Sequence, residues 1–374
     1  MVTGFQMNIP QDQDSDDPWT LLPGSAAAGQ SEPDRPVLQV DTIEGVEPLD
    51  TQIGVFPKKT VPDALHDALF GQPEPTAAEI KAAGGDPAAI PPMQTYAILD
   101  AAKVTNPLEL LERSGLEHRC LFKGAAYDEL KNVAPWIVRL EEGNAFTRNL
   151  FTRSDAHWHH WDKEPGICVR SRGTLDDMWK HFRKFTRVQD EDGNWLYWRF
   201  WDNPVNTTLI SMGSSGEATE LVVPLFGGGK IAAFVLRNGF GQWQHICWHG
   251  RAALPQKKPI LTHDVRRLMR RLRQIFEFEK LARVSTCKVA ERQRIDEAKA
   301  MASLRSRRDE FLSLGFWRRD HLAKICCWEL MLGPDFIGRF ESGRVKDIML
   351  EAVTPEVRIS KTEELLATVA QEKG

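Results

Sequence analysis

A short histidine-rich run at 156–161, AHWHHW, has the residue types for proton transfer or metal binding. Its histidines are His157, His159 and His160. In an extended segment His157 and His159 point the same way, and with Asp155 and Asp162 beside them they suggest a metal-dependent hydrolase. A metal site needs three or four ligands, and no second pair with ligand spacing accompanies this run. The run therefore also fits a loop of rings and imidazoles that contacts a partner.

Two glycine-rich stretches have the composition of catalytic loops without the spacing. FGGGK at 226–230 would need a glycine at Pro224 and a hydroxyl residue at Ile231 to be a phosphate loop. GSSGE at 213–217 has Glu217 where a nucleophile elbow needs its last glycine. The six cysteines contain no C-x-x-C pair, so neither a zinc ribbon nor a disulfide framework is predicted. We expect no catalytic residue, cofactor or metal from these motifs.

Basic residues concentrate on one predicted helix at 261–283. Apolar residues recur along it at helical spacing, and arginines occupy most of the remaining surface. The candidate contacts are Arg266, Arg270 and Arg273. Acidic residues interleave downstream and the chain carries a formal net charge of -4, which disfavours a polyanion as ligand. We predict a surface for an acidic protein partner or for the chain's own acidic arm, with nucleic-acid binding as the alternative.

Tryptophan is concentrated in the middle of the chain, where nine lie between Trp136 and Trp248. This is more than a sheet needs to fill its core, and tryptophan is a frequent anchor of protein interfaces. Core packing accounts for most of them. We predict that Trp158, Trp161 and Trp201 line a groove that binds a partner.

A helix, a turn and a strand at 174–204 are expected to organise the body that positions these groups. Thr174 and Asp177 have the spacing of a capping box, which begins a helix with one apolar face. A turn with glycine and asparagine follows, and 195–201 then alternates as a strand that is apolar on both faces. Such a strand suits the centre of a sheet that is covered on two sides.

Arg199 is the one cation within this predicted strand. A guanidinium among aromatic rings needs a carboxylate, because burying an unpaired charge is too costly. Asp202, just beyond the strand, is the expected partner. We interpret the pair as a structural contact that fixes the corner between the strand and a helix at 204–212, with a catalytic role as the alternative.

The remaining periodicities divide the chain into three parts. Alternating strands and helices at 93–256 predict an α/β (α+β) lobe with a mixed or mostly parallel sheet flanked by helices. The strands expected near its end are 219–225, 230–237 and 242–248. From 257 to 374 the apolar spacing is helical, and we predict an all-α C-terminal lobe.

The first 92 residues are rich in Pro, Gly, Ala and Asp, and their acidic residues far outnumber the basic ones. This composition predicts a weakly ordered acidic arm at 1–92, with short helices at 62–70 and 76–83 that lie along the body or dock on a partner. No apolar run approaches the roughly 20 residues that cross a bilayer, and the first residues lack a signal-peptide pattern. We expect a cytoplasmic protein without membrane contact.

Four segments, in order, carry a resemblance to a known family. They are QTYAILDAA at 94–102, which includes Asp100; LFKGAAYDELKNVAPWIVRL at 121–140; RFWDNP, with Arg199 and Asp202; and the segment from LGPDFIGRF to EELL near the C-terminus. This order resembles the type VI secretion effector adaptor or chaperone family, from about residue 94 onward. One departure is that Asn203 separates the Asp and Pro that adjoin in the family's turn.

The resemblance implies a function and a role for the motif residues. Members of that family are bacterial cytoplasmic adaptors without enzymatic activity, which hold a cognate effector and help to load it onto the VgrG spike. It also implies that Asp100, Arg199 and Asp202 are structural motif residues, and that the chain takes no cofactor.

Overall fold

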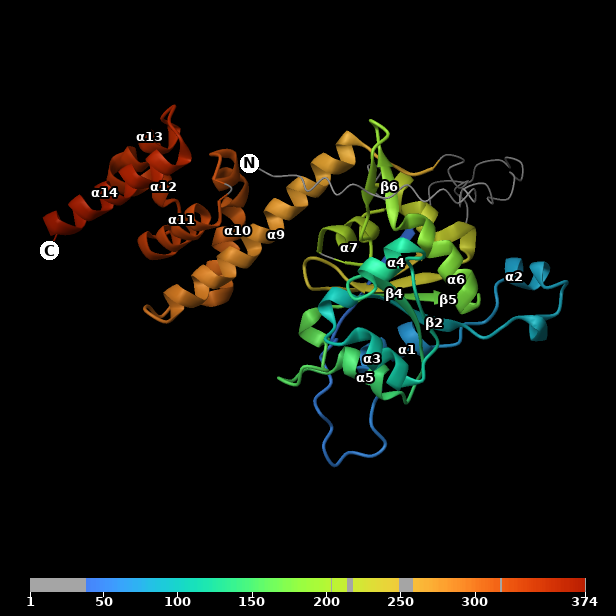
Figure 1. Ribbon diagram of the computed structural model, residues 1–374. Helices are drawn as coiled ribbons and strands as arrows, with labels where there is room; N and C mark the ends of the chain where they lie inside the picture. Colours follow the sequence, from blue (N-terminus) through green and yellow to red (C-terminus); the bar gives the residue numbers. More distant parts are fainter. Residues whose placement is uncertain (1–37, 203, 214–217, 249–257, 317, 374) are drawn as a thin grey trace. The chain divides into compact units, whose positions relative to one another are not determined.

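The strand predicted at 94–99 forms as β2, Gln94–Asp100, and lies inside the larger sheet of the computed structural model (Figure 1). All its residues from Thr95 to Asp100 are buried. β2 pairs with β4 on one side and with β5 on the other, and helices cover both faces of the sheet. Its sequence is apolar at nearly every position because both faces of the strand are buried.

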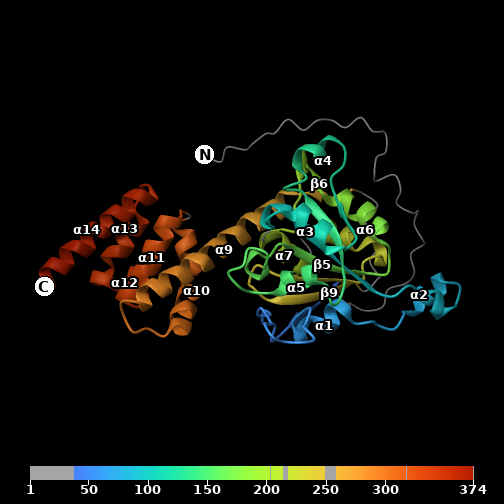
Figure 2. The same cartoon turned by 60° about the horizontal axis from the view of Figure 1, so that its bottom comes forward.

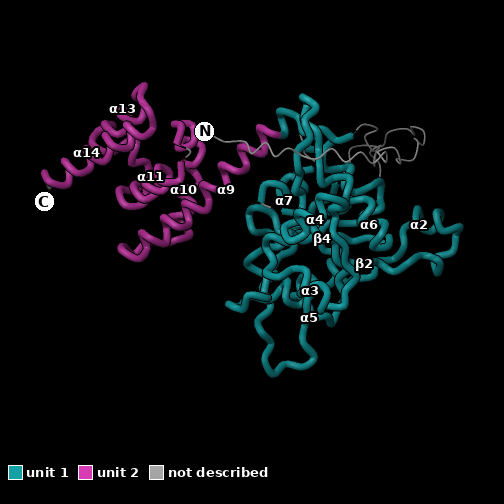
Figure 3. Tube along the Cα trace, in the orientation of Figure 1, with its two compact units in different colours: residues 1–265 teal, residues 266–374 magenta. Residues whose placement is uncertain are grey.

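The structure describes residues 38–373 apart from 203, 214–217, 249–257 and 317. The chain forms two compact units, residues 1–265 and 266–374, which Figure 3 distinguishes by colour. The lobe boundary that we predicted at 256/257 lies outside the described residues.

The larger sheet has seven strands in the order β1-β9-β8-β5-β2-β4-β3. In chain order these are β1 Leu38–Ile43, β2 Gln94–Asp100, β3 His118–Cys120, β4 Pro135–Leu140, β5 Gly166–Ser171, β8 Ala233–Arg237 and β9 Trp243–Trp248. All six pairings are antiparallel, so the expectation of a mixed or mostly parallel sheet is wrong here, although the α+β class is confirmed. A helix between two strands indicates parallel pairing only if it crosses over, and α4 (Ala125–Leu130) instead joins the antiparallel neighbours β3 and β4.

Helices pack against both faces of this sheet (Figures 1 and 2). One face is covered by α1 (Asp63–Phe70), α3 (Pro107–Ser114) and α5 (Ala145–Phe151), whose buried residues share a cluster with Ala97, Leu99 and Val138. The other carries α6 (Leu175–Phe182) and, after it, α7 (Pro204–Ser211). Phe182 of α6 packs its ring 6.2 Å from that of Phe234 on β8.

Part of the predicted arm belongs to this body. β1 pairs with β9 along its whole length, and Leu65 and Leu69 of α1 are fully buried in the core. The expectation of a weakly ordered arm is therefore wrong for these segments. An edge strand needs only backbone pairing, and two leucines on one helical face supply burial that an average composition does not reveal. Residues 1–37 lie outside the described part of the chain.

A second, three-stranded sheet corrects the prediction for 195–201. Its order is β10-β6-β7, formed by Ile260–Leu261, Arg187–Asp190 and Trp195–Tyr197. The strand predicted at 195–201 is thus only three residues long, and it lies at an exposed edge rather than at a sheet centre. The segment predicted as a strand at 219–225 is instead α8 (Thr219–Val222) followed by a 3-10 turn, Val223–Gly229.

The second unit is all-α among its described residues, as predicted. Its helices are α9 His263–Ala290, α10 Glu297–Ser313, α11 Arg319–Leu332, α12 Phe336–Arg339, α13 Arg344–Leu350 and α14 Pro355–Lys373, the first of which begins within the preceding unit. They enclose a separate core that includes Phe278, Phe311 and Phe316. Nowhere in the described chain is a helix both long and apolar enough to cross a membrane.

Candidate functional site

The three motif residues meet at the end of β2. Asp100, the last residue of that strand, has a side chain that is only 1% exposed. The Arg199 guanidinium donates to the Asp100 carboxylate and, at 2.8 Å, pairs with Asp202. Lys103 adds a second cation beside Asp202. Asp202 is thus a partner of Arg199 as predicted, while the contacts with Asp100 and Lys103 were not foreseen.

Burial and the neighbouring Arg199 charge act in opposite directions on the pKa of Asp100. Burial raises the pKa of its carboxyl above the usual range, and the Arg199 guanidinium opposes this shift. The Asp100 carboxylate also accepts a hydrogen bond from the backbone N–H of Ala102 at 3.1 Å. Arg199 extends the connection further, because its carbonyl accepts from the Asn206 side chain of α7 at 2.8 Å. The cluster therefore joins the end of β2 to the segment that leads into α7.

The histidine run does not form the extended segment that we expected. Residues 157 and 158 form a turn, and the loop is held by contacts among its own residues. The Arg153 guanidinium pairs with Asp162, and His159 Nδ1 lies 2.6 Å from the Ser154 hydroxyl. No group of three or more His, Cys, Asp or Glu in the described chain is arranged to hold a metal ion.

His160 lies apart from its neighbours in this run. It is fully buried, and among the described residues neither ring nitrogen has a hydrogen-bond partner. Burial lowers the pKa of His160 to about 4, so the ring is neutral at physiological pH. His181 of α6 is similar, with its pKa also lowered to about 4 by burial, although its Nε2 donates to the Leu225 carbonyl at 2.7 Å.

The three tryptophans that we predicted to line a groove are not brought together as one surface. Trp158 is 44% exposed, but Trp161 and Trp201 are buried. The Trp161 ring packs 5.8 Å from that of Trp243, and the Trp201 ring packs 5.1 Å from that of Phe200. Trp161 and Trp201 are therefore core residues, and the predicted groove is wrong for both.

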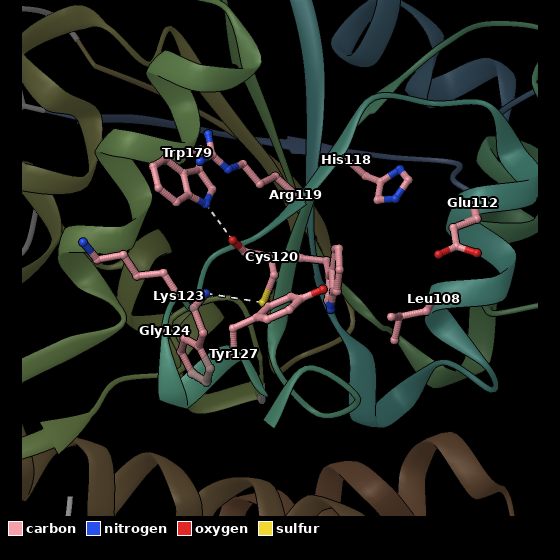
Figure 4. Close-up of a pocket in the computed structure, with 11 residues that line it drawn as sticks. Leu108, Glu112, His118, Arg119, Cys120, Lys123, Gly124, Tyr127 and Trp179 are labelled. Carbon is pink, nitrogen blue, oxygen red and sulfur yellow. Dashed lines mark hydrogen bonds between the residues drawn. The ribbon is translucent and has the colours of Figure 1, made fainter. Parts of the chain in front are cut away.

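A hollow of about 510 Å³ lies instead beside the edge strand β3 (Figure 4). Its lining comes from α3, β3, α4, β4 and α6. The residues that line it include Leu108, Glu112, His118, Tyr127, Trp136 and Trp179. Four of these side chains are aromatic or imidazole rings, which offer large, stiff apolar surfaces, and Glu112, Arg119 and Lys123 add charged groups to the lining.

Two of the hollow's polar groups are fixed by Trp179. The Trp179 indole N–H donates to the Cys120 carbonyl at 2.6 Å, and the Arg119 guanidinium stacks 3.4 Å from the ring centre. Arg119 also pairs with Asp176 at 2.9 Å. Burial raises the pKa of the Cys120 thiol to about 11, which keeps it protonated and poorly nucleophilic. His118 Nδ1 donates to the Leu116 carbonyl at 2.7 Å.

The hairpin of β6 and β7 borders this hollow. Trp195, Leu196 and Tyr197 of β7 are each 36–39% exposed, which is unusual for three consecutive large apolar residues. The Tyr197 ring lies 5.7 Å from that of Phe122, which lines the hollow. We call the hollow and β7 together the aromatic surface. The run of exposed apolar types was visible in the sequence, but we interpreted it as a buried strand.

The predicted basic contacts lie on α9. Arg270 lines a second hollow together with Arg267 and Arg271, which we had not singled out. Arg273 is exposed and does not line that hollow, and Arg266 is half-buried. The three predicted arginines therefore do not act as a single cluster.

Removing Arg199 tests the structural reading of the motif. Arg199→Ala leaves the buried Asp100 carboxylate without its nearest cation, and we expect the free energy of unfolding to fall by about 2 kcal/mol. Denaturant unfolding measures this. Arg153→Ala is the control, because the exposed pair with Asp162 is worth less than about 1 kcal/mol. Asp100→Asn in the Arg199→Ala background should recover part of the loss. A fully stable Arg199→Ala protein that binds no partner would assign Arg199 to an interface instead.

The buried histidines predict a dependence of stability on pH. The pKa of His160 is about 4 in the fold, whereas an unperturbed histidine of the unfolded chain has a pKa of 6.5, so the unfolded state binds more protons between these values. Stability should therefore fall as the pH drops from about 6.5 to about 4, by up to about 1.4 kcal/mol per pH unit for each such histidine. His160→Leu should reduce this slope and keep wild-type stability at pH 8. An unchanged slope would mean that His160 is protonated in the folded protein.

Comparison with known proteins gives one match. Residues 95–220 match the family described as "Domain of unknown function (DUF4123)". No curated protein and no solved structure matches the chain. The matched residues include the Asp100, Arg199 and Asp202 cluster and the whole aromatic surface, so the chain is similar to that family over the part that carries its candidate site.

Proposed function

We propose that this chain is a non-enzymatic adaptor or chaperone, acting in the bacterial cytoplasm, that binds a type VI secretion effector and helps to load it onto the VgrG spike. The match at 95–220 covers the motif segments at 121–140 and 199–204 and nearly all of 94–102, on which the resemblance to such adaptors rests. The observation that carries the proposal is the aromatic surface within that stretch.

The chemistry of the aromatic surface suits binding better than reaction. Aromatic rings and a stacked arginine are the side chains that most often anchor protein interfaces. The Cys120 thiol is kept protonated, and Nδ1 of His118 is taken up by a backbone carbonyl. We therefore propose that the hollow receives a side chain of a partner polypeptide rather than a substrate.

The register of β7 supports an extended partner segment. The Trp198 N–H donates to the Thr186 carbonyl and the Asp190 N–H donates to that of Asn194. Hydrogen-bonded pairs alternate along an antiparallel ladder, so the backbone N–H and C=O of the intervening Leu196 also face β6. The backbone N–H and C=O groups of Trp195 and Tyr197 point away from β6. β7 is the last strand in the order of this sheet, so these groups can pair with an added strand.

Tyr197 connects the two parts of the aromatic surface. A segment that pairs with β7 would run beside Tyr197, whose ring contacts Phe122 at the hollow. Side chains of an extended segment alternate between two faces, so every second one would point toward the hollow's side. Main-chain pairing then supplies affinity, and the hollow supplies selectivity.

Co-expression tests the proposal. The tagged full-length protein should co-purify with the effector encoded by a neighbouring gene, and it should raise the yield of that effector because binding stabilises both folded partners. The VgrG protein of the same gene cluster is added in a second capture. Recovery of neither the effector nor VgrG would overturn the proposal.

Exposed aromatic residues can be compared within the same experiment. We expect Trp195→Ala with Tyr197→Ala to weaken effector binding about tenfold or more, since tryptophan and tyrosine are common hot spots. Phe240→Ala is the matched control, because Phe240 is 53% exposed but lies outside this surface. Trp158→Ala is measured beside them. A loss confined to Trp158→Ala would move the interface to the histidine loop.

A further inference from the structure

The second unit carries a cationic hollow that the proposed function does not use. It measures about 650 Å³ and is lined by residues of α9 and α10. Arg267, Arg270 and Arg271 line it from α9, where a spacing of three and four residues sets them on one helical face. Asp309 of α10 is the one carboxylate in the lining. We call this site the arginine hollow.

The acidic residues around the arginine hollow are already paired with other cations. Asp309 pairs with Arg308 at 3.0 Å, and Glu310 pairs with Arg307 at 2.9 Å. On the α9 side, Glu279 pairs with Arg305 at 3.0 Å. No ion pair in the described chain involves Arg270 or Arg271, and both are exposed. The pKa of Asp309 is lowered by its hydrogen bond to Arg308 and, more weakly, by the charge of Arg271. Positive charge is therefore in excess at this hollow.

Two apolar residues also line the arginine hollow, beside the polar Gln274 and Ser313. Ile275 of α9 and Leu312 of α10 both belong to its lining. The helices beneath them are packed firmly, since the Phe278 and Phe311 rings lie 6.3 Å apart in the unit's core. A ligand that fits this site carries anionic groups for Arg270 and Arg271 and an aliphatic group for Ile275 and Leu312.

We infer that the arginine hollow binds an acidic segment of a partner polypeptide, in which Asp or Glu residues lie beside an aliphatic one. Charge complementarity selects the carboxylates, and the aliphatic contacts distinguish this ligand from a nucleic-acid backbone. A nucleic acid is also disfavoured because carboxylates follow the arginines along the same helix, among them Glu277 and Glu279. The inference concerns a unit outside the matched residues and does not depend on the aromatic surface.

Charge reversals at two places on α9 distinguish binding in the arginine hollow from binding to any exposed arginine of that helix. The full-length protein is titrated into a fluorescein-labelled peptide of four Glu-Glu-Leu repeats, and binding is followed by fluorescence anisotropy. We expect R270E/R271E to weaken binding about tenfold or more. R273E is the matched control, because Arg273 is an exposed arginine of the same helix that does not line the hollow; it should change binding less than about twofold.

Further probes define the ligand. A peptide of four Gln-Gln-Leu repeats should bind weakly, and higher salt should weaken the acidic peptide because exposed charges are screened. R270Q/R271Q, which removes charge without reversing it, repeats the test if the double reversal lowers the melting temperature. The inference is overturned if the wild-type protein fails to bind the acidic peptide, if R273E weakens binding as much as R270E/R271E, or if duplex DNA binds more tightly than the peptide. None of these outcomes depends on effector capture, so this inference and the proposed function can fail separately.

Discussion

The buried charge of Asp100 is the constraint on which the α+β unit depends. A carboxylate with 1% exposure at the end of a central strand requires a cation, and the fold supplies Arg199 from a segment 99 residues later in the chain. Because Arg199 also holds Asp202 and accepts from Asn206, this one contact fixes the path from β7 to α7. The exposed hairpin therefore leads into a connection that is fixed to the end of β2.

Local signals in the sequence predicted many of the elements. The capping box of Thr174 and Asp177 begins α6 as expected, and the buried run of β2 forms its strand. The prediction of a strand at 195–201 was wrong because aromatic residues are common both in strands and in irregular segments that are buried in a core. Trp198, Phe200 and Trp201 are buried in irregular chain, whereas Trp195 to Tyr197 lie at an edge. Burial at such positions is decided by distant segments, which alternation within seven residues does not reveal.

The candidate site was predicted only in part for the same reason. Asp202 lies three residues from Arg199, so their pairing is a local signal, but Asp100 reaches Arg199 only through the fold. The aromatic surface draws on five elements between α3 and α6, together with β7, and no spacing in the sequence links Phe122 with Tyr197. Likewise, the composition of α9 predicted basic contacts but not which arginines share a site. Arg270 lines the hollow with residues of α10 and Arg273 does not, a difference that depends on how α10 packs against α9.

The two units present different recognition chemistry. The α+β unit offers rings and an open strand edge, which suit an extended apolar segment, and the helical unit offers excess arginine charge. Hydrogen–deuterium exchange of the protein with and without the proposed effector tests the central claim, binding through the aromatic surface, most directly. The account predicts slowed exchange on complex formation at the amides of β7 and of residues 118–123. Slowed exchange confined to other segments, such as the loop at 153–163, would contradict it.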